Sequence, residues 1–198
     1  WTSDESCAIR PAAVTEVERL AETFAEEVLA RTPVGATFLG DRRYDDRLND
    51  IGPTARQAER DALTRLQDAL GHLESSPETD AEGRITRHML ALAATHGIAT
   101  LDHRLYQLAV DQLSGPQVAL ALLLHWHTLE TEKNARDLLA RLRGIPAFVD
   151  QYIANLTEGV AEGRTSWRTA CDRVVTQIRV FLATEPELSA YGRAVAKS

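Results

Sequence analysis

The chain has 198 residues, a formal net charge of −7, 44% hydrophobic residues and 26% charged residues. This length and composition are typical of one globular domain with its own core, and they exclude a disordered, collagen-like or disulfide-dense chain. No apolar run approaches the roughly 18–20 residues that a membrane-spanning helix needs, so we expect no membrane span.

The charge is concentrated in the amino-terminal portion. Residues 1–80 contain 17 Asp and Glu against 9 Lys and Arg, a balance of −8, whereas residues 81–198 contain 12 against 13, a balance of +1. Binding to nucleic acid needs clustered Lys and Arg, and the Arg residues here are scattered. We therefore expect no nucleic-acid partner.

The two cysteines, Cys7 and Cys171, do not form a Cys-x-x-Cys motif, so the sequence predicts neither a redox pair nor a zinc site from them. A disulfide between them is an open alternative. The chain begins at Trp1 and shows no signal-peptide pattern. We expect a cytoplasmic location, with export as the alternative if Trp1 follows a cleavage point.

In chain order, the first predicted element is an amphipathic helix over Pro11–Arg31, with Pro11 in its first turn. Its apolar face recurs at spacings of three and four through Val14, Val17, Ala21, Phe24 and Val28. Pro33–Leu39 predicts a short helical turn, which Gly40 ends by adopting the left-handed conformation. Residues 41–53 are rich in Asp and Arg and predict an irregular loop.

Two long helices should follow. The first runs over Thr54–Leu73, and its buried face is predicted to consist of Leu63, Leu66, Leu70 and Leu73. Thr79 and Glu82 resemble a capping box and predict a helix from there to Leu108. The predicted buried face of that helix contains Ile85, Met89, Leu92, Ile98, Leu101 and Leu105.

The remaining predicted helices cover Gln117–Trp126, Thr128–Arg143, Pro146–Glu162 and a last segment to Ala183 that Thr165 or Ser166 caps. The apolar face of the last helix is predicted to be Ala170, Val174, Ile178 and Phe181. No long segment alternates with period two. The sequence thus predicts an all-α fold, an irregular bundle of about six to eight helices, with an arm over residues 1–10, one domain over 11–185 and a tail over 186–198.

Metal-ligand motifs are absent from the sequence: it contains neither His-Glu-x-x-His nor a pair of Glu-x-x-His segments. The nearest group is His125, His127 and Glu130. On a continuous helix, His127 and Glu130 would share a face. Two or three scattered ligands fall short of a zinc site, so we prefer a structural role for the two histidines near the helix junction and keep the metal role as a weaker alternative.

The loop after Gly40 is the densest group of polar side chains. Asp41, Arg42 and Tyr44 could face a substrate cleft, or the loop could be solvated and paired with itself. Exposed charge clusters usually contribute little energy, which favours the second interpretation from the residues alone.

Two segments resemble a bacterial family catalogued as domain of unknown function 885. One is residues 33–45 (PVGATFLGDRRYD), and the other combines residues 140–146 (ARLRGIP) with residues 156–159 (LTEG). The order and distance of these segments make the resemblance specific. The positions that match recurrent family positions are Gly40, Asp41, Arg42, Tyr44, Arg141 and Pro146.

The family is similar to zinc metallopeptidases of the gluzincin type, with a zinc segment and a downstream Glu beyond the portion matched here. The resemblance implies that this chain is the amino-terminal helical part of such a hydrolase, walling a substrate cleft, with zinc only in the rest of a full-length member. The implied partners are that catalytic portion or a partner subunit, and a peptide-like substrate. The chain alone is then not expected to be catalytic.

Within this interpretation, Asp41, Arg42 and Tyr44 are the residues that we expect at the cleft, whereas Gly40, Arg141 and Pro146 have ready roles in a turn, helix pairing and a helix start. The alternative function is a stand-alone, non-catalytic helical binding or scaffold protein. The first hypothesis predicts a large exposed apolar surface for docking, and the alternative predicts a self-contained core.

Overall fold

The computed structural model describes residues 15–73 and 80–195, and these residues form helices and connecting loops. In chain order the elements are α1 (Glu16–Arg31), α2 (Pro33–Phe38), α3 (Pro53–His72), α4 (Ala81–Asp102), the 3₁₀ turn η2 (Leu105–Leu108), α5 (Pro116–Trp126), α6 (Glu132–Arg143), α7 (Ile145–Ala161), α8 (Arg168–Ala183), the 3₁₀ turn η3 (Pro186–Leu188) and α9 (Ala190–Val195). The all-α prediction is confirmed. No helix in these ranges is both long and apolar enough to cross a membrane.

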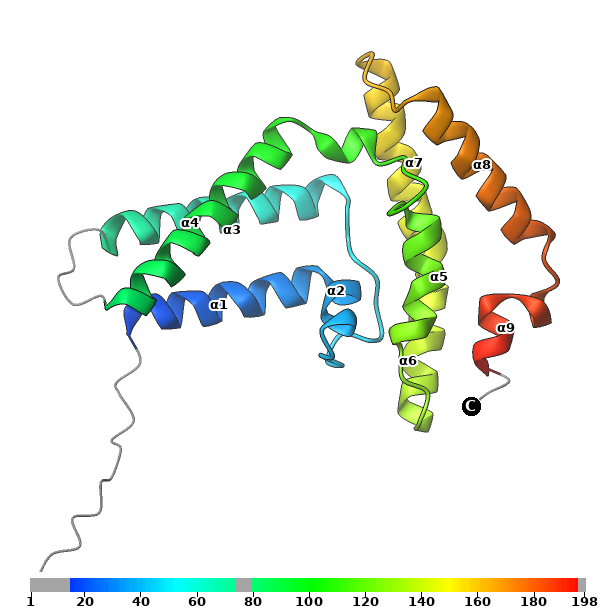
Figure 1. The fold of residues 1–198 in the computed structure, drawn as a ribbon, viewed down its shortest axis with the longest axis horizontal. Helices are drawn as coiled ribbons and strands as arrows, with labels where there is room; N and C mark the ends of the chain where they lie inside the picture. Colours follow the sequence, from blue (N-terminus) through cyan, green and yellow to red (C-terminus); the bar gives the residue numbers. More distant parts are fainter. Residues whose placement is uncertain (1–14, 74–79, 196–198) are drawn as a thin grey trace, which may run out of the picture.

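The helices form two groups (Figure 1). Helices α1 and α3 lie side by side, and α4 crosses over them, whereas α5, α6 and α7 run roughly at right angles to the axes of α1 and α3, with α8 and α9 beyond them. The core of the first group is made by Leu66 and Leu70 of α3 with Leu90 and Ala94 of α4, against Phe24 and its neighbours on α1. The predicted buried face of α3 is confirmed, because all four of its leucines are buried.

Local capping sets the helix starts, and it corrects two predictions. Helix α1 begins at Glu16, later than Pro11, because Thr15 and Glu18 form a capping box that the sequence analysis missed. Helix α6 begins at Glu132 rather than Thr128, because Thr131 caps it in the same way with Asn134. Pro11 itself lies outside the described residues.

The far end of α4 is a further correction. The helix ends at Asp102, not at Leu108, because Arg104 adopts a left-handed backbone conformation with φ of 51° and the chain continues as η2. The predicted left-handed Gly40, with φ of 90°, is confirmed after α2. Neither Thr165 nor Ser166 caps α8: its N-cap is Trp167, and the Ser166 hydroxyl donates to the Leu108 carbonyl instead.

The predicted buried face of α4 is also wrong in the first half of the helix, whereas Ile98 and Leu101 in the second half are partly buried. Ile85, Met89 and Leu92 are exposed, and the residues that pack on α1 and α3 are Leu90 and Ala94. Helix α4 is apolar on two sides, so periodicity could not say which side would meet α3. We call Ile85, Met89 and Leu92 the apolar stripe of α4.

Candidate functional site

A buried ion pair lies where the loop after α2 meets α6. Arg141 is fully buried and Asp45 is 1% exposed, and Arg141 Nη2 lies 3.6 Å from Asp45 Oδ1. Arg141 also donates to the Tyr44 and Arg47 carbonyls, at 2.8 Å each. Burial lowers the pKa of the guanidinium and the charge of Asp45 raises it, but an arginine stays protonated at any ordinary pH. The loop is therefore wrapped around a fixed positive charge.

Thr37 and His127 complete this group, which we call the Arg141 cluster: Arg141, Asp45, Thr37 and His127. The Thr37 hydroxyl donates to Asp45 Oδ1 at 2.5 Å and accepts from Arg141 Nη2 at 2.9 Å. The His127 Nε2 lies 2.9 Å from the Asn134 carbonyl, and its Nδ1 lies 3.4 Å from Arg141 Nη1. The same Nδ1 lies 3.9 Å from Asp45 Oδ2, so the ring contacts both members of the buried ion pair.

Both ring nitrogens of His127 are thus engaged within the protein. The predicted shared face of His127 and Glu130 does not form, because α5 ends at Trp126 and α6 starts only at Glu132. His125 and Glu130 are exposed. Among the described residues, no group of three or more His, Cys, Asp or Glu side chains could hold a metal ion. Cys171 is a free thiol at intermediate exposure, and its pairing with Cys7 lies outside the described residues.

The three residues predicted to reach a cleft all lie on the loop that surrounds Arg141. The exposed guanidinium of Arg42 donates to the Trp126 carbonyl at 2.7 Å and lies 3.7 Å from Asp45 Oδ2. The ring of Tyr44 lies between the guanidinium groups of Arg43 and Arg47, 5.3 and 5.0 Å from its centroid. These contacts give the loop a defined shape, and the cleft role stays a prediction.

Asp41 belongs to an exposed chain of charges on the same loop. Arg43 donates to both Asp41 oxygens and, through Nη1, to Glu26 at 2.7 Å. The hydrogen bonds from Arg43 lower the pKa of Asp41 and of Glu26, so both carboxylates are ionised at neutral pH. Arg43 therefore links Asp41 and the loop to Glu26 on α1.

A second polar cluster joins α3, η2 and α7, and the sequence analysis missed it. Arg56 Nη1 donates to Asn155 Oδ1 at 2.5 Å, and its guanidinium lies 3.8 Å from the centroid of the Tyr106 ring. Gln107, 1% exposed, donates to Glu158 Oε1 at 3.1 Å, as does the Tyr106 hydroxyl. We call these residues the Arg56 cluster. Its only sequence signal was the LTEG segment, which contains Glu158.

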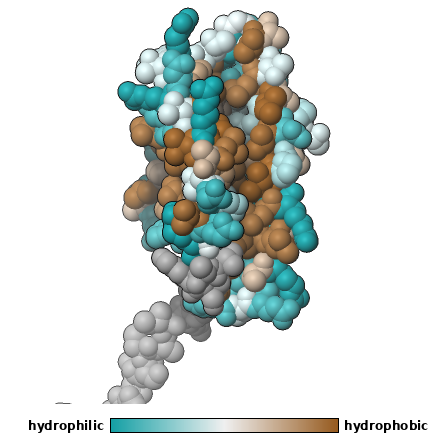
Figure 2. Space-filling model, turned by 90° about the vertical axis from the view of Figure 1, so that its right-hand side faces the viewer, coloured by the Kyte–Doolittle hydropathy of each residue, from teal (hydrophilic) through white to brown (hydrophobic). Residues whose placement is uncertain are grey.

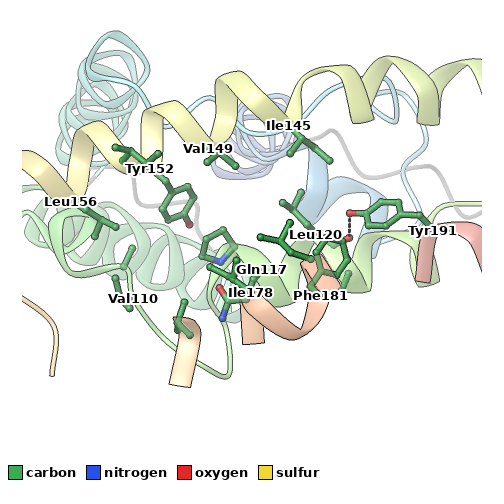
Figure 3. A pocket seen from close by; sticks show the side chains of 16 residues that line it. Val110, Gln117, Leu120, Ile145, Val149, Tyr152, Leu156, Ile178, Phe181 and Tyr191 are labelled. Carbon is green, nitrogen blue, oxygen red and sulfur yellow. Dashed lines mark hydrogen bonds between the residues drawn. The ribbon is translucent and has the colours of Figure 1, made fainter. Parts of the chain in front are cut away.

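An apolar cavity of about 480 Å³ lies among α5, α7, α8 and α9 (Figure 3). None of Asp41, Arg42 and Tyr44 lines it. The predicted apolar face of α8 borders the cavity through Val174, Ile178 and Phe181, yet α8 has no buried residue. Apolar side chains gather across this face of the molecule in Figure 2. No pattern in the sequence indicated the cavity, because an amphipathic pattern does not tell how closely a helix packs.

One comparison with known proteins identifies a family that matches most of the chain. The family model described as "Bacterial protein of unknown function (DUF885)" matches residues 33–198. The match contains the loop after α2, the Arg141 cluster, the Arg56 cluster and the cavity. No curated protein matches the chain.

Proposed function

Because the chain belongs to this bacterial family of unknown function, we propose that it is the amino-terminal helical part of a zinc-metallopeptidase-like hydrolase. In this proposal it walls a substrate cleft for a peptide-like substrate, and the zinc and the general base belong to residues outside this chain. The resemblance supports the reaction class. The chain's own contribution is a rigid wall and a docking surface.

The observation that carries the proposal is the apolar stripe of α4. Ile85, Met89 and Leu92 are 65%, 60% and 37% exposed and follow one another at i, i+4 and i+7, while Leu90 and Ala94 bury the other side of the same helix. Leaving such a stripe in water is unfavourable, and this spacing is the one that a helix presents to a partner groove or helix. We assign the stripe to docking of the catalytic portion.

The loop after α2 is the proposed cleft wall. Asp41, Arg42 and Tyr44 stand on it, and the Arg141 cluster fixes its backbone from inside through the Tyr44 and Arg47 carbonyls. A wall held by buried hydrogen bonds keeps its charged side chains in one arrangement, which suits recognition of a peptide. None of these residues is assigned a chemical step.

The test is association with the catalytic portion, identified by a zinc-binding His-Glu segment encoded after Ser198 or in an adjacent gene. The two parts, produced together, should copurify and cleave peptides. The double variant Ile85→Gln and Met89→Gln should weaken association at least tenfold, since fully burying one such side chain contributes about 1.5–3 kcal/mol. Glutamine keeps helix propensity, so the fold should persist.

The matched control is Val160→Gln on α7, which is 64% exposed and outside the stripe. It should leave the dissociation constant unchanged. Finding no zinc segment in either gene would refute the proposal, as would equal weakening by both variants. A monomeric chain that associates with no catalytic portion would instead favour the stand-alone scaffold.

A further inference from the structure

The cavity behind α8 has the size and lining of a small-molecule site. Its volume of about 480 Å³ lies within the range of about 300–1,000 Å³ that ligand pockets occupy. Leu120, Val149, Leu156 and Ile178 are among its walls, and no Asp, Glu, Lys, Arg or His lines it. Figure 3 shows these side chains directed toward the space between α5, α7 and α8.

Polar contacts hold α8 and α9 in place around the cavity. Gln177 on α8 donates to the Gln112 carbonyl at 3.0 Å and accepts from Gln117 on α5 at 2.9 Å. The Tyr191 hydroxyl on α9 donates to the Leu120 carbonyl at 3.2 Å, as drawn in Figure 3. The apolar face of α8 is therefore held near α5 and α7 without closing on them, and the walls lack the dispersion contacts that an occupant would supply.

Three polar side chains line the cavity, Gln117, Tyr152 and Tyr191, and the donors of Gln117 and Tyr191 are already bonded within the protein. Tyr152 extends from α7 into the cavity (Figure 3). The ring contacts Phe148, and no described residue forms a hydrogen bond with its hydroxyl. Burial raises the pKa of Tyr152, which keeps the phenol protonated and able to donate. Tyr152 is half-buried, and its hydroxyl is a free donor at the cavity, so a ligand oxygen there can accept its hydrogen bond.

We propose that this cavity binds a neutral, single-chain amphiphile whose hydrocarbon body lies against α5, α7 and α8 and whose one hydroxyl or carbonyl oxygen accepts a hydrogen bond from Tyr152. The absence of charged residues from the lining selects against a carboxylate or an ammonium group, because a buried charge without a partner is costly. This inference does not depend on the proposed hydrolase function.

The proposal is tested on the full chain with the apolar fluorophore phenylnaphthylamine, displaced by decanol or decanoate. Decanol should displace the dye at a concentration at least tenfold lower than decanoate. Tyr152→Phe should weaken decanol about two- to tenfold, the effect of losing one neutral hydrogen bond, and should leave dye affinity unchanged. A general loss of structure would weaken the binding of both decanol and the dye, so a loss confined to decanol identifies the hydrogen bond.

A cavity-filling pair provides the control. Ile153 lines the cavity and is 56% exposed, so Ile153→Trp should fill it without unfolding α7 and should remove binding of both dye and decanol. Val160→Trp on the same helix should bind both normally. Equal competition by decanoate and decanol would overturn the proposal, as would unchanged decanol binding in Tyr152→Phe. A third result would also overturn the proposal. If the chain is a dimer that binds neither probe and that Ile153→Trp dissociates, a second copy of the chain fills the cavity.

Discussion

At the residue scale, Arg141 has a larger role than the helix pairing that the family match suggested. Its guanidinium is fully buried and satisfies two backbone carbonyls, Thr37 and the carboxylate of Asp45. Asp45 Oδ2 has no hydrogen bond among the described residues. The negative charge of this carboxylate is therefore balanced by the nearby guanidinium groups of Arg141 and Arg42. One side chain thus determines the shape of the proposed cleft wall.

We predict that Arg141→Ala lowers the free energy of unfolding by about 3–5 kcal/mol, because it leaves the buried carboxylate of Asp45 with only the partly exposed Arg42 nearby and removes the donors to the Tyr44 and Arg47 carbonyls. Chemical denaturation followed by circular dichroism measures the loss. Arg136→Ala on the same helix is the matched control. Arg136 is exposed, and its ion pair with Glu132 spans a single turn of α6. This variant should change stability by less than about 0.5 kcal/mol. Similar losses in both variants would contradict this account of Arg141.

At the element scale, the contact between α3 and α4 depends on a glycine. A Cβ on Gly97 would lie 2.7 Å from Leu63 Cδ1, inside the core of the first group. The sequence shows Gly97 only as a weak point in a helix. In the structure it allows the two helices to approach closely, a role that becomes visible only once the partner helix is known.

Gly97→Ala should destabilise the protein by about 1 kcal/mol, since overpacking costs about 1–3 kcal/mol and better helix propensity returns about 1 kcal/mol. Gly71→Ala, near the end of α3, is the comparison, because a Cβ there meets nothing within 4 Å. That variant should stabilise the protein by about 0.5–1 kcal/mol. Midpoints of thermal unfolding compare the two, and a stabilising Gly97→Ala would show that Leu63 can move aside.

At the scale of the whole molecule, two polar clusters join the two groups of helices. The Arg141 cluster ties α6 to the loop after α2, and the Arg56 cluster ties α3 to η2 and α7. Gln151 of α7 adds a further link, because its side-chain oxygen accepts from the Ile51 backbone N–H at 3.0 Å. Hydrogen-bonded pairs, rather than a common apolar core, connect the layer of α1, α3 and α4 with α6 and α7.

We therefore predict that the double variant Arg56→Ala and Arg141→Ala uncouples the two groups. In a Trp1→Phe background, tryptophan fluorescence reports on Trp126 and Trp167 in the second group, and far-ultraviolet circular dichroism reports on all helices. In the variant the fluorescence midpoint in urea should fall below the dichroism midpoint. The pair Arg65→Ala and Arg136→Ala, both at exposed sites, should keep the two curves superimposed. Superimposed curves in the test variant would refute the uncoupling.

The sequence by itself determined the helical class, most helix boundaries and the buried leucines of α3, because these follow from glycine and proline chemistry and from a single apolar face. Its matched segments also contain Arg141 and Glu158, the centres of contact in the two clusters. Only the tertiary structure decided which side of α4 is buried, that Arg141 is paired with Asp45, and that α8 leaves a cavity. Those features depend on distances between elements far apart in the chain, and a periodic pattern carries no information about such distances.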